Sequence, residues 1–163
     1  MSAVPQELEG LAEVRRAARQ RGDFSLLRAR VPYSAFLGVE IAMQDGQPRF
    51  RLPFRDSLIG NTVLPALHGG VIAGFMEDAA MLHLLLVMDE MQVPKSINFS
   101  IDYLRSAAAQ ETLALCEVAR QGRRVAQVKI RCLQEEAGHP GRMREVALGR
   151  AHFLLTAPHD EDK

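Results

Sequence analysis

The chain has 163 residues, a length that suggests a single domain with a real hydrophobic core. It carries 20 basic and 20 acidic side chains, so its formal net charge is zero and its isoelectric point lies near 7. This balance gives no general electrostatic attraction to nucleic acid or to an anionic membrane, and we expect neither as a partner. The hydrophobic fraction of 47% is that of an ordinary globular protein.

The N-terminal residues predict three short helical stretches. Residues 5–20 have apolar side chains at helical spacing, and residues 24–30 and 32–38 favour shorter helical turns. Six arginines between positions 15 and 30 make this part of the chain basic. We interpret them as a solvated face on a helix that packs on a sheet edge or a partner subunit. The sharper alternative is a contact for a phosphorylated ligand.

The strand-like segments surround one long apolar stretch. Residues 39–43 and 48–53 predict a hairpin turning at Asp45-Gly46, and residues 56–67 read as a loop. Four more strands are predicted at 96–104, 111–120, 123–134 and 144–156, followed by a polar tail. A hairpin centred on Gln121-Gly122 would pair residues whose numbers sum to about 243. That register places Leu113 opposite Ile130 and Leu115 opposite Val128.

The two cysteines are too few for a disulfide framework. In the same register Cys116 faces Gln127 rather than Cys132. We therefore expect free thiols and a reducing compartment. The N-terminus lacks the apolar core of a signal peptide, so a cytoplasmic location is the expectation.

Residues 71–88 predict a long helix that is apolar on most sides, as in the core of a soluble protein. Adjacent Glu77 and Asp78 near its middle argue against a membrane span, because ionisable groups are costly in hydrocarbon. A helix of this kind needs a curved sheet to enclose it. The sequence thus predicts an α+β fold with the helix on the concave face of an antiparallel sheet.

His68-Gly69-Gly70 stands where this helix begins. Its first N–H groups lack partners within the helix, and glycine lets a ligand approach the backbone closely. Such a site suits an anion, or a carbonyl oxygen that becomes an anion during reaction. The alternative is that both glycines only allow tight packing of the helix against a strand.

One face of the helix has almost no side-chain bulk before it reaches a carboxylate, which leaves room for a substrate. Glu77 would be the base on this face, unless it is a solvated carboxylate at a subunit edge. Asp78 points about 100° away and is interpreted as structural, paired with a base or a backbone donor. His83 is interpreted as a core or interface histidine. The face comprises Gly70, Ala73, Gly74, Glu77, Met81 and Leu84.

Other chemistries lack their motifs. The chain has no GxxxxGK[ST] or GxGxxG phosphate loop and no GxSxG nucleophile elbow. Its five histidines show no metal-binding spacing. We therefore expect no metal and no redox cofactor.

The segments HGGVIAGFMEDAA at 68–80, SINFSIDYLRSA at 96–107 and the GRR turn at 122–124 resemble the hotdog-fold acyl-CoA thioesterases. Within that family the chain is most similar to the 4-hydroxybenzoyl-CoA and phenylacetyl-CoA thioesterases. The resemblance implies a hotdog domain at 31–156, with about six antiparallel strands around one central helix. A helical extension at 1–30 and a tail at 157–163 flank it. It also implies homodimers or homotetramers with active sites at the dimer interface.

The resemblance implies roles for single residues. Glu77 would be nucleophile or general base, the Gly69 amide would polarise the thioester carbonyl, and Ser96 would hold water or substrate. The family asparagine six residues before the histidine is replaced by Thr62, with Asn61 one residue further away. The full expected set is Glu77, Gly69, Gly70, His68 and Ser96 for catalysis, and Asn61, Thr62, Gly74, Met81, Arg105, Arg123 and Arg124 for acyl-CoA binding.

The predicted function is hydrolysis of acyl-CoA. A non-catalytic acyl-CoA-binding module is the main alternative. A dehydratase on the same fold would need an Asp/His or Glu/His arrangement that the sequence does not offer. Neither the acyl group nor the choice between dimer and tetramer follows from the sequence.

Overall fold

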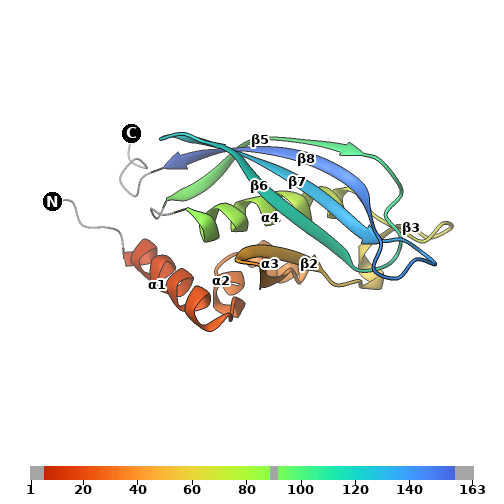
Figure 1. The fold of residues 1–163 in the computed structure, drawn as a ribbon, viewed down its shortest axis with the longest axis horizontal. Helices are drawn as coiled ribbons and strands as arrows, with labels where there is room; N and C mark the ends of the chain where they lie inside the picture. The colour runs from red at the N-terminus through yellow and green to blue at the C-terminus, as the bar shows by residue number, and fades with distance from the viewer. Residues whose placement is uncertain (1–5, 89–91, 157–163) are drawn as a thin grey trace.

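The computed structural model describes residues 6–88 and 92–156, so the predicted tail at 157–163 lies outside the described residues. Three helices precede the first strand, and one long helix separates two groups of strands (Figure 1). The elements are α1 (Gln6–Arg21), α2 (Ser25–Ala29), α3 (Pro32–Leu37), β1 (Glu40–Gln44), β2 (Gln47–Leu52), β3 (Ile59–Asn61), β4 (Ala66–Leu67), α4 (Gly69–Val87), β5 (Val93–Tyr103), β6 (Thr112–Gln121), β7 (Val125–Glu135) and β8 (Met143–Thr156).

Six strands form one antiparallel sheet in the order β1-β2-β6-β7-β8-β5, and the sheet curves around α4 (Figure 1). The predicted hotdog architecture is confirmed. β5 and β1 are the two edges, and β5 is much the longer edge, with 11 residues.

α4 is buried because its apolar side chains meet both the sheet and the N-terminal helices. Phe75 and Met76 are fully buried, and a Cβ on Gly149 of β8 would lie 2.8 Å from Met76 Cε. By length and composition α4 could cross a membrane, but 61% of its most apolar window is buried inside the fold. It is therefore the core helix that the sequence predicts.

α1 covers the C-terminal end of α4. The Arg15 guanidinium donates to the carbonyls of Leu85 at 3.3 Å and Met88 at 2.7 Å, and Arg19 donates to that of Leu86. The last carbonyls of a helix lack intrahelical partners and carry partial negative charge, so cations stabilise them. These two arginines thus cap α4. The solvated face predicted for them is wrong for Arg15, which is partly buried, whereas Arg19 is exposed.

The predicted register of the β6–β7 hairpin is also wrong. Cys116 faces Ile130, three residues from the prediction, because the turn lies at residues 122–124 and β6 carries a bulge between Val118 and Arg120. An odd shift exchanges the two faces of a strand. Ala114 is therefore in the core, and Leu115 lies on the outer face. Both cysteines are free, as expected.

The predicted loop at 56–67 contains structure of its own. A single 3-10 turn at Asp56–Leu58 leads into a small hairpin of β3 and β4. The second strand of this hairpin ends at Leu67, directly before His68, the N-cap of α4.

Candidate active site

His68 is the N-cap of α4. Its Nδ1 accepts a hydrogen bond of 2.9 Å from the Gly70 N–H, so a neutral His68 carries its proton on Nε2. The Gly69 N–H has no acceptor among the described residues, and Tyr103 on β5 donates its hydroxyl to the Gly69 carbonyl at 2.8 Å. Of the two predicted amides, that of Gly69 is thus open to a ligand, while that of Gly70 is engaged by His68.

Gly60 on β3 makes room for this cap. A Cβ on Gly60 would lie 2.6 Å from His68 Cα and 2.8 Å from both Cβ and Cδ2 of His68. Atoms do not approach this closely, so only glycine lets β3 pass behind the histidine. The Gly60 contact is invisible in the sequence, where Gly60 reads only as a turn former.

Glu77 lies on the one side of α4 that is not covered. Gly70 is exposed, and Ala73, Gly74, Glu77 and Met81 are partly exposed, in a strip along the helix. The Glu77 carboxylate has no hydrogen-bond or ion-pair partner in residues 6–88 and 92–156. A carboxylate that is neither paired nor fully solvated is available to act as a base on a bound substrate.

The neighbouring Asp78 has a structural role. It is 5% exposed, and the hydroxyl of fully buried Ser34 donates to its carboxylate, 2.6 Å from Oδ1 and 2.8 Å from Oδ2. Burial raises the pKa of Asp78 to about 6, against the opposing effect of the Ser34 hydrogen bond. The structural role is as predicted, but the partner is a hydroxyl rather than a base or a backbone donor.

His83 is buried beside Phe50, with ring centroids 6.3 Å apart. Its Nδ1 has no hydrogen-bond partner in the described structure. Burial, followed by the charge of Arg49, lowers the pKa of His83 to about 4, so this core imidazole is neutral at pH 7.

α3 reaches over the strip of small residues. The Tyr33 hydroxyl would lie 2.4 Å from a Cβ placed on Gly74, so the phenol occupies the space that a side chain at this position would fill. Tyr33 stacks on Phe36 with ring centroids 6.1 Å apart, and both rings are substantially exposed. The strip predicted to be bare therefore has a tyrosine over one of its glycines.

A pocket of about 420 Å³ opens beside Gly69 and is lined by Tyr103, Arg105 and Val146, among others. Arg105 donates to the Glu145 carbonyl at 2.8 Å from a largely exposed position. Arg124 lies at the other end of the sheet, where its carbonyl accepts from Leu155 N–H. Val146 and Leu155 are nine residue steps apart along β8, which corresponds to about 30 Å. Within one chain only Arg105, and not Arg123 or Arg124, lies close to Gly69.

The remaining predicted residues lie in different surroundings. Asn61 accepts with Oδ1 from the N–H groups of Val63 at 3.0 Å and Leu64 at 3.2 Å, which folds the exposed loop that also contains Thr62. Ser96 is exposed on β5 and pairs with Phe153. It stands seven residues before Tyr103, or about 20 Å along the strand from the Gly69 contact.

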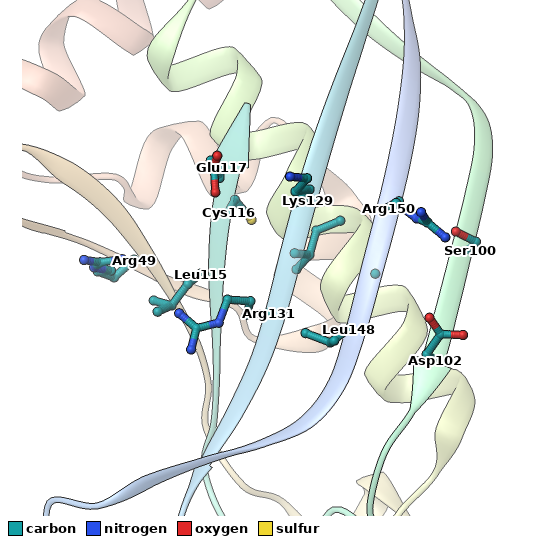
Figure 2. A pocket seen from close by; sticks show the side chains of 12 residues that line it. Arg49, Ser100, Asp102, Leu115, Cys116, Glu117, Lys129, Arg131, Leu148 and Arg150 are labelled. Atoms are coloured by element: carbon teal, nitrogen blue, oxygen red, sulfur yellow. The ribbon is translucent and has the colours of Figure 1, made fainter. Parts of the chain in front are cut away.

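A further concavity lies elsewhere on the surface. A groove of about 480 Å³ runs across the outer face of the sheet, on the side away from α4 (Figure 2). Lys129, Arg131 and Arg150 line it, and neither Glu77 nor Gly69 does. Because the helix and its open strip are on the opposite face, this groove is not the predicted site. No group of three or more metal-binding side chains occurs in residues 6–88 and 92–156.

Comparison with known proteins gives the family. Residues 64–139 match the sequence model of the thioesterase superfamily. The chain is 38% identical to a structurally characterised protein from Chromobacterium violaceum, over 91% of this chain and 97% of that one, with a TM-score of 0.69. It is 28% identical over 121 residues to the medium/long-chain acyl-CoA thioesterase YigI of Escherichia coli K12, which covers 65% of this chain and 77% of YigI. The chain belongs to the thioesterase superfamily.

This thioesterase superfamily member is a thioester hydrolase with the hotdog fold. A thioesterase from Haemophilus influenzae has the same fold at 18% identity, with a TM-score of 0.67 over 79% of this chain and 85% of that one. The family match begins at residue 64, so α3, the helix that contributes Tyr33 and Ser34, lies outside it.

Proposed function

We propose that this thioesterase hydrolyses acyl-CoA to the free acid and CoA, with Glu77 as general base or nucleophile. The observation that carries this proposal is the Glu77 carboxylate on the open strip of α4. Within residues 6–88 and 92–156 it has no partner, and the Gly69 N–H of the same helix has no acceptor. The Gly69 N–H donates to the thioester carbonyl oxygen and stabilises the charge that grows there.

In the general-base form, Glu77 takes one proton from a water molecule as its oxygen attacks the carbonyl carbon. The tetrahedral intermediate collapses, the C–S bond breaks, and the CoA thiolate leaves. The proton held by Glu77 passes to the thiolate sulfur, and the acid is released. Atoms and charge balance without a metal or a redox cofactor.

Arg105 is the residue best placed to bind a CoA phosphate, because it lines the pocket beside Gly69. A guanidinium matches phosphate oxygens in geometry and charge. For the acyl group we propose a medium or long chain, since the curated relative YigI is a medium/long-chain acyl-CoA thioesterase. The exposed apolar side chains of Val63, Leu64 and Phe36 supply surface for it.

We also propose a homodimer that pairs two β5 edges. β5 is a long edge strand, and its Ile97 and Tyr103 are 56% and 54% exposed. A long unpaired edge with apolar side chains favours pairing with another strand. In such a dimer the active sites lie between subunits, as the family resemblance implies. The free thiols of Cys116 and Cys132 support a reducing compartment such as the cytoplasm.

The direct test follows thiol release from acyl-CoAs of two to sixteen carbons, with benzoyl-CoA and phenylacetyl-CoA included. Two variants each remove one proposed group. Glu77→Gln removes the base, and Gly69→Pro removes one N–H at a position where helices accept proline. Both should lower kcat at least about a hundredfold with little change in melting temperature. Saturable binding without thiol release by the wild-type protein would point instead to a binding module.

Mixing the two inactive variants tests whether each active site contains residues from both subunits. If Gly69 and Glu77 of one site come from different subunits, each mixed dimer has one intact site. Random exchange at equal amounts then restores about a quarter of the wild-type rate. No recovery, with exchange verified by mass spectrometry, would place the whole site in one chain.

A further inference from the structure

Hydrogen bonds at both ends of α3 fix this helix, and with it Tyr33, against α4. The adjacent Ser34 is fully buried and donates to both carboxylate oxygens of Asp78. At the other end of α3, Arg55 donates to the carbonyls of Phe36 and Leu37, each at 2.9 Å. The helix is thus fixed in register on α4, and Tyr33 cannot slide along the strip without breaking a buried hydrogen bond.

This register sets the distance from the Tyr33 hydroxyl to Glu77. The phenol oxygen lies 2.4 Å from the Cβ position of Gly74, and Glu77 follows Gly74 by three residues on the same helix face. Side chains three residues apart on a helix have Cβ atoms about 5 to 6 Å from each other. A glutamate carboxylate can therefore come within one water molecule of the phenol oxygen.

The hydroxyl is otherwise unused. Tyr33 has no hydrogen-bond partner among the described residues, and its ring is 48% exposed. The buried Ser34–Asp78 hydrogen bond fixes α3, and the absence of a side chain on Gly74 leaves space for the phenol. Together they place the Tyr33 hydroxyl beside Glu77.

We propose that Tyr33 and Glu77 of one chain jointly hold the water that attacks the thioester; this inference rests on the proposed function. The water donates one hydrogen to the Glu77 carboxylate and the other to the Tyr33 phenol oxygen. One lone pair of the water then faces the carbonyl carbon. Glu77 takes the first proton as the C–O bond forms, and Tyr33 keeps its own proton throughout. Ser34 and Asp78 act as positioning residues for Tyr33.

The test is Tyr33→Phe, which removes one oxygen and keeps the ring on Phe36. Because one hydrogen bond to the attacking water is lost, kcat should fall about tenfold while KM stays within about twofold. The melting temperature should not change. Leu26→Ala, which alters an exposed side chain of α2 outside the pocket beside Gly69, is the control and should leave kcat unchanged.

A double-variant cycle separates water positioning from general packing. In the Glu77→Gln background no activated water remains to be held, so Tyr33→Phe should lower the residual rate less than twofold. Full tenfold losses in both backgrounds would overturn the joint role, and so would a wild-type kcat for Tyr33→Phe alone. If the wild-type protein released no thiol from any acyl-CoA, the proposed function would fall as well. If the wild-type protein hydrolyses acyl-CoA and Tyr33→Phe has the same kcat, only the proposed role of Tyr33 is refuted.

Discussion

Gly60→Ala is the change for which the structure gives the sharpest expectation. The new methyl group would lie 2.6 Å from His68 Cα, which is a backbone atom, so rotation of the imidazole cannot relieve the overlap. β3 and β4 must separate instead, and the His68 cap on α4 is disturbed with them. Overpacking costs about 1 to 3 kcal/mol, and loss of a helix cap adds about 1 kcal/mol.

We therefore expect Gly60→Ala to lower the free energy of unfolding by about 2 to 4 kcal/mol. For a chain of this size that corresponds to a melting temperature about 5 to 15 °C lower. Thiol release should fall at least about tenfold, because the Gly69 N–H moves with the cap.

Gly10→Ala is the matched control and should raise, not lower, the free energy of unfolding. Gly10 lies inside α1, and the nearest atom to its added Cβ is Arg30 Nη2 at 3.8 Å. Alanine in a helix interior is about 1 kcal/mol more favourable than glycine, so this variant should melt about 2 to 4 °C higher. A Gly60→Ala protein as stable and as active as the wild type would refute the close approach of Gly60 to His68.

Three further predictions concern charge and the thiols. The pKa of Asp78 is raised from 3.8 to about 6, so its contribution favours folding at low pH and is lost as the pH rises from about 4 through 6. In denaturant unfolding, the free energy of unfolding of Asp78→Asn, relative to that of the wild type, should therefore rise by about 2 to 3 kcal/mol between pH 4 and 7.5. A difference that does not change with pH would contradict this expectation. Arg105→Ala should raise KM for acyl-CoA about tenfold and leave KM for a short acyl thioester without the CoA nucleotide unchanged; equal effects on both substrates would argue against a phosphate contact. Burial raises the pKa of Cys132 to about 12, so in the folded protein it should resist a thiol reagent at pH 8 and react when guanidinium is added.

The features that the sequence predicted correctly are those encoded locally. The apolar run after Gly70 and the alternation along residues 126–132 each determine an element and its buried face. The helix-start pattern also pointed to Gly69 and Glu77, whose catalytic roles stay predictions. Because α4 is nearly apolar all round, the positions of glycine and alanine indicated which of its sides is least covered, but not that Tyr33 lies over Gly74.

The errors arose at one strand irregularity and at contacts between segments that are distant in the sequence. The bulge between Val118 and Arg120, together with a longer turn, moved the hairpin register by three residues. No hydrophobic pattern distinguished the two registers, since both faces of β6 carry apolar side chains. Tyr33 and Ser34 were missed because their partners on α4 are more than 40 residues away in sequence. A contact of this kind depends on how α3 docks, which local propensity does not determine.

The arrangement of elements around α4 has a consequence for how the chain is synthesised. α1 and α3 precede α4, whereas β5 to β8, which cover most of its remaining surface, follow it. When α4 leaves the ribosome, only the elements that precede it in the chain (α1, α3 and β2) can contact it, and the rest of this apolar helix stays exposed until the strands as far as Thr156 have been made. The early helices, with Arg15 and Arg19 on the end of α4, thus give the nascent helix its first partners within the chain. In a chain without residues 6–37, α4 would emerge with only β2 to contact, and we expect aggregation during expression to be the first effect.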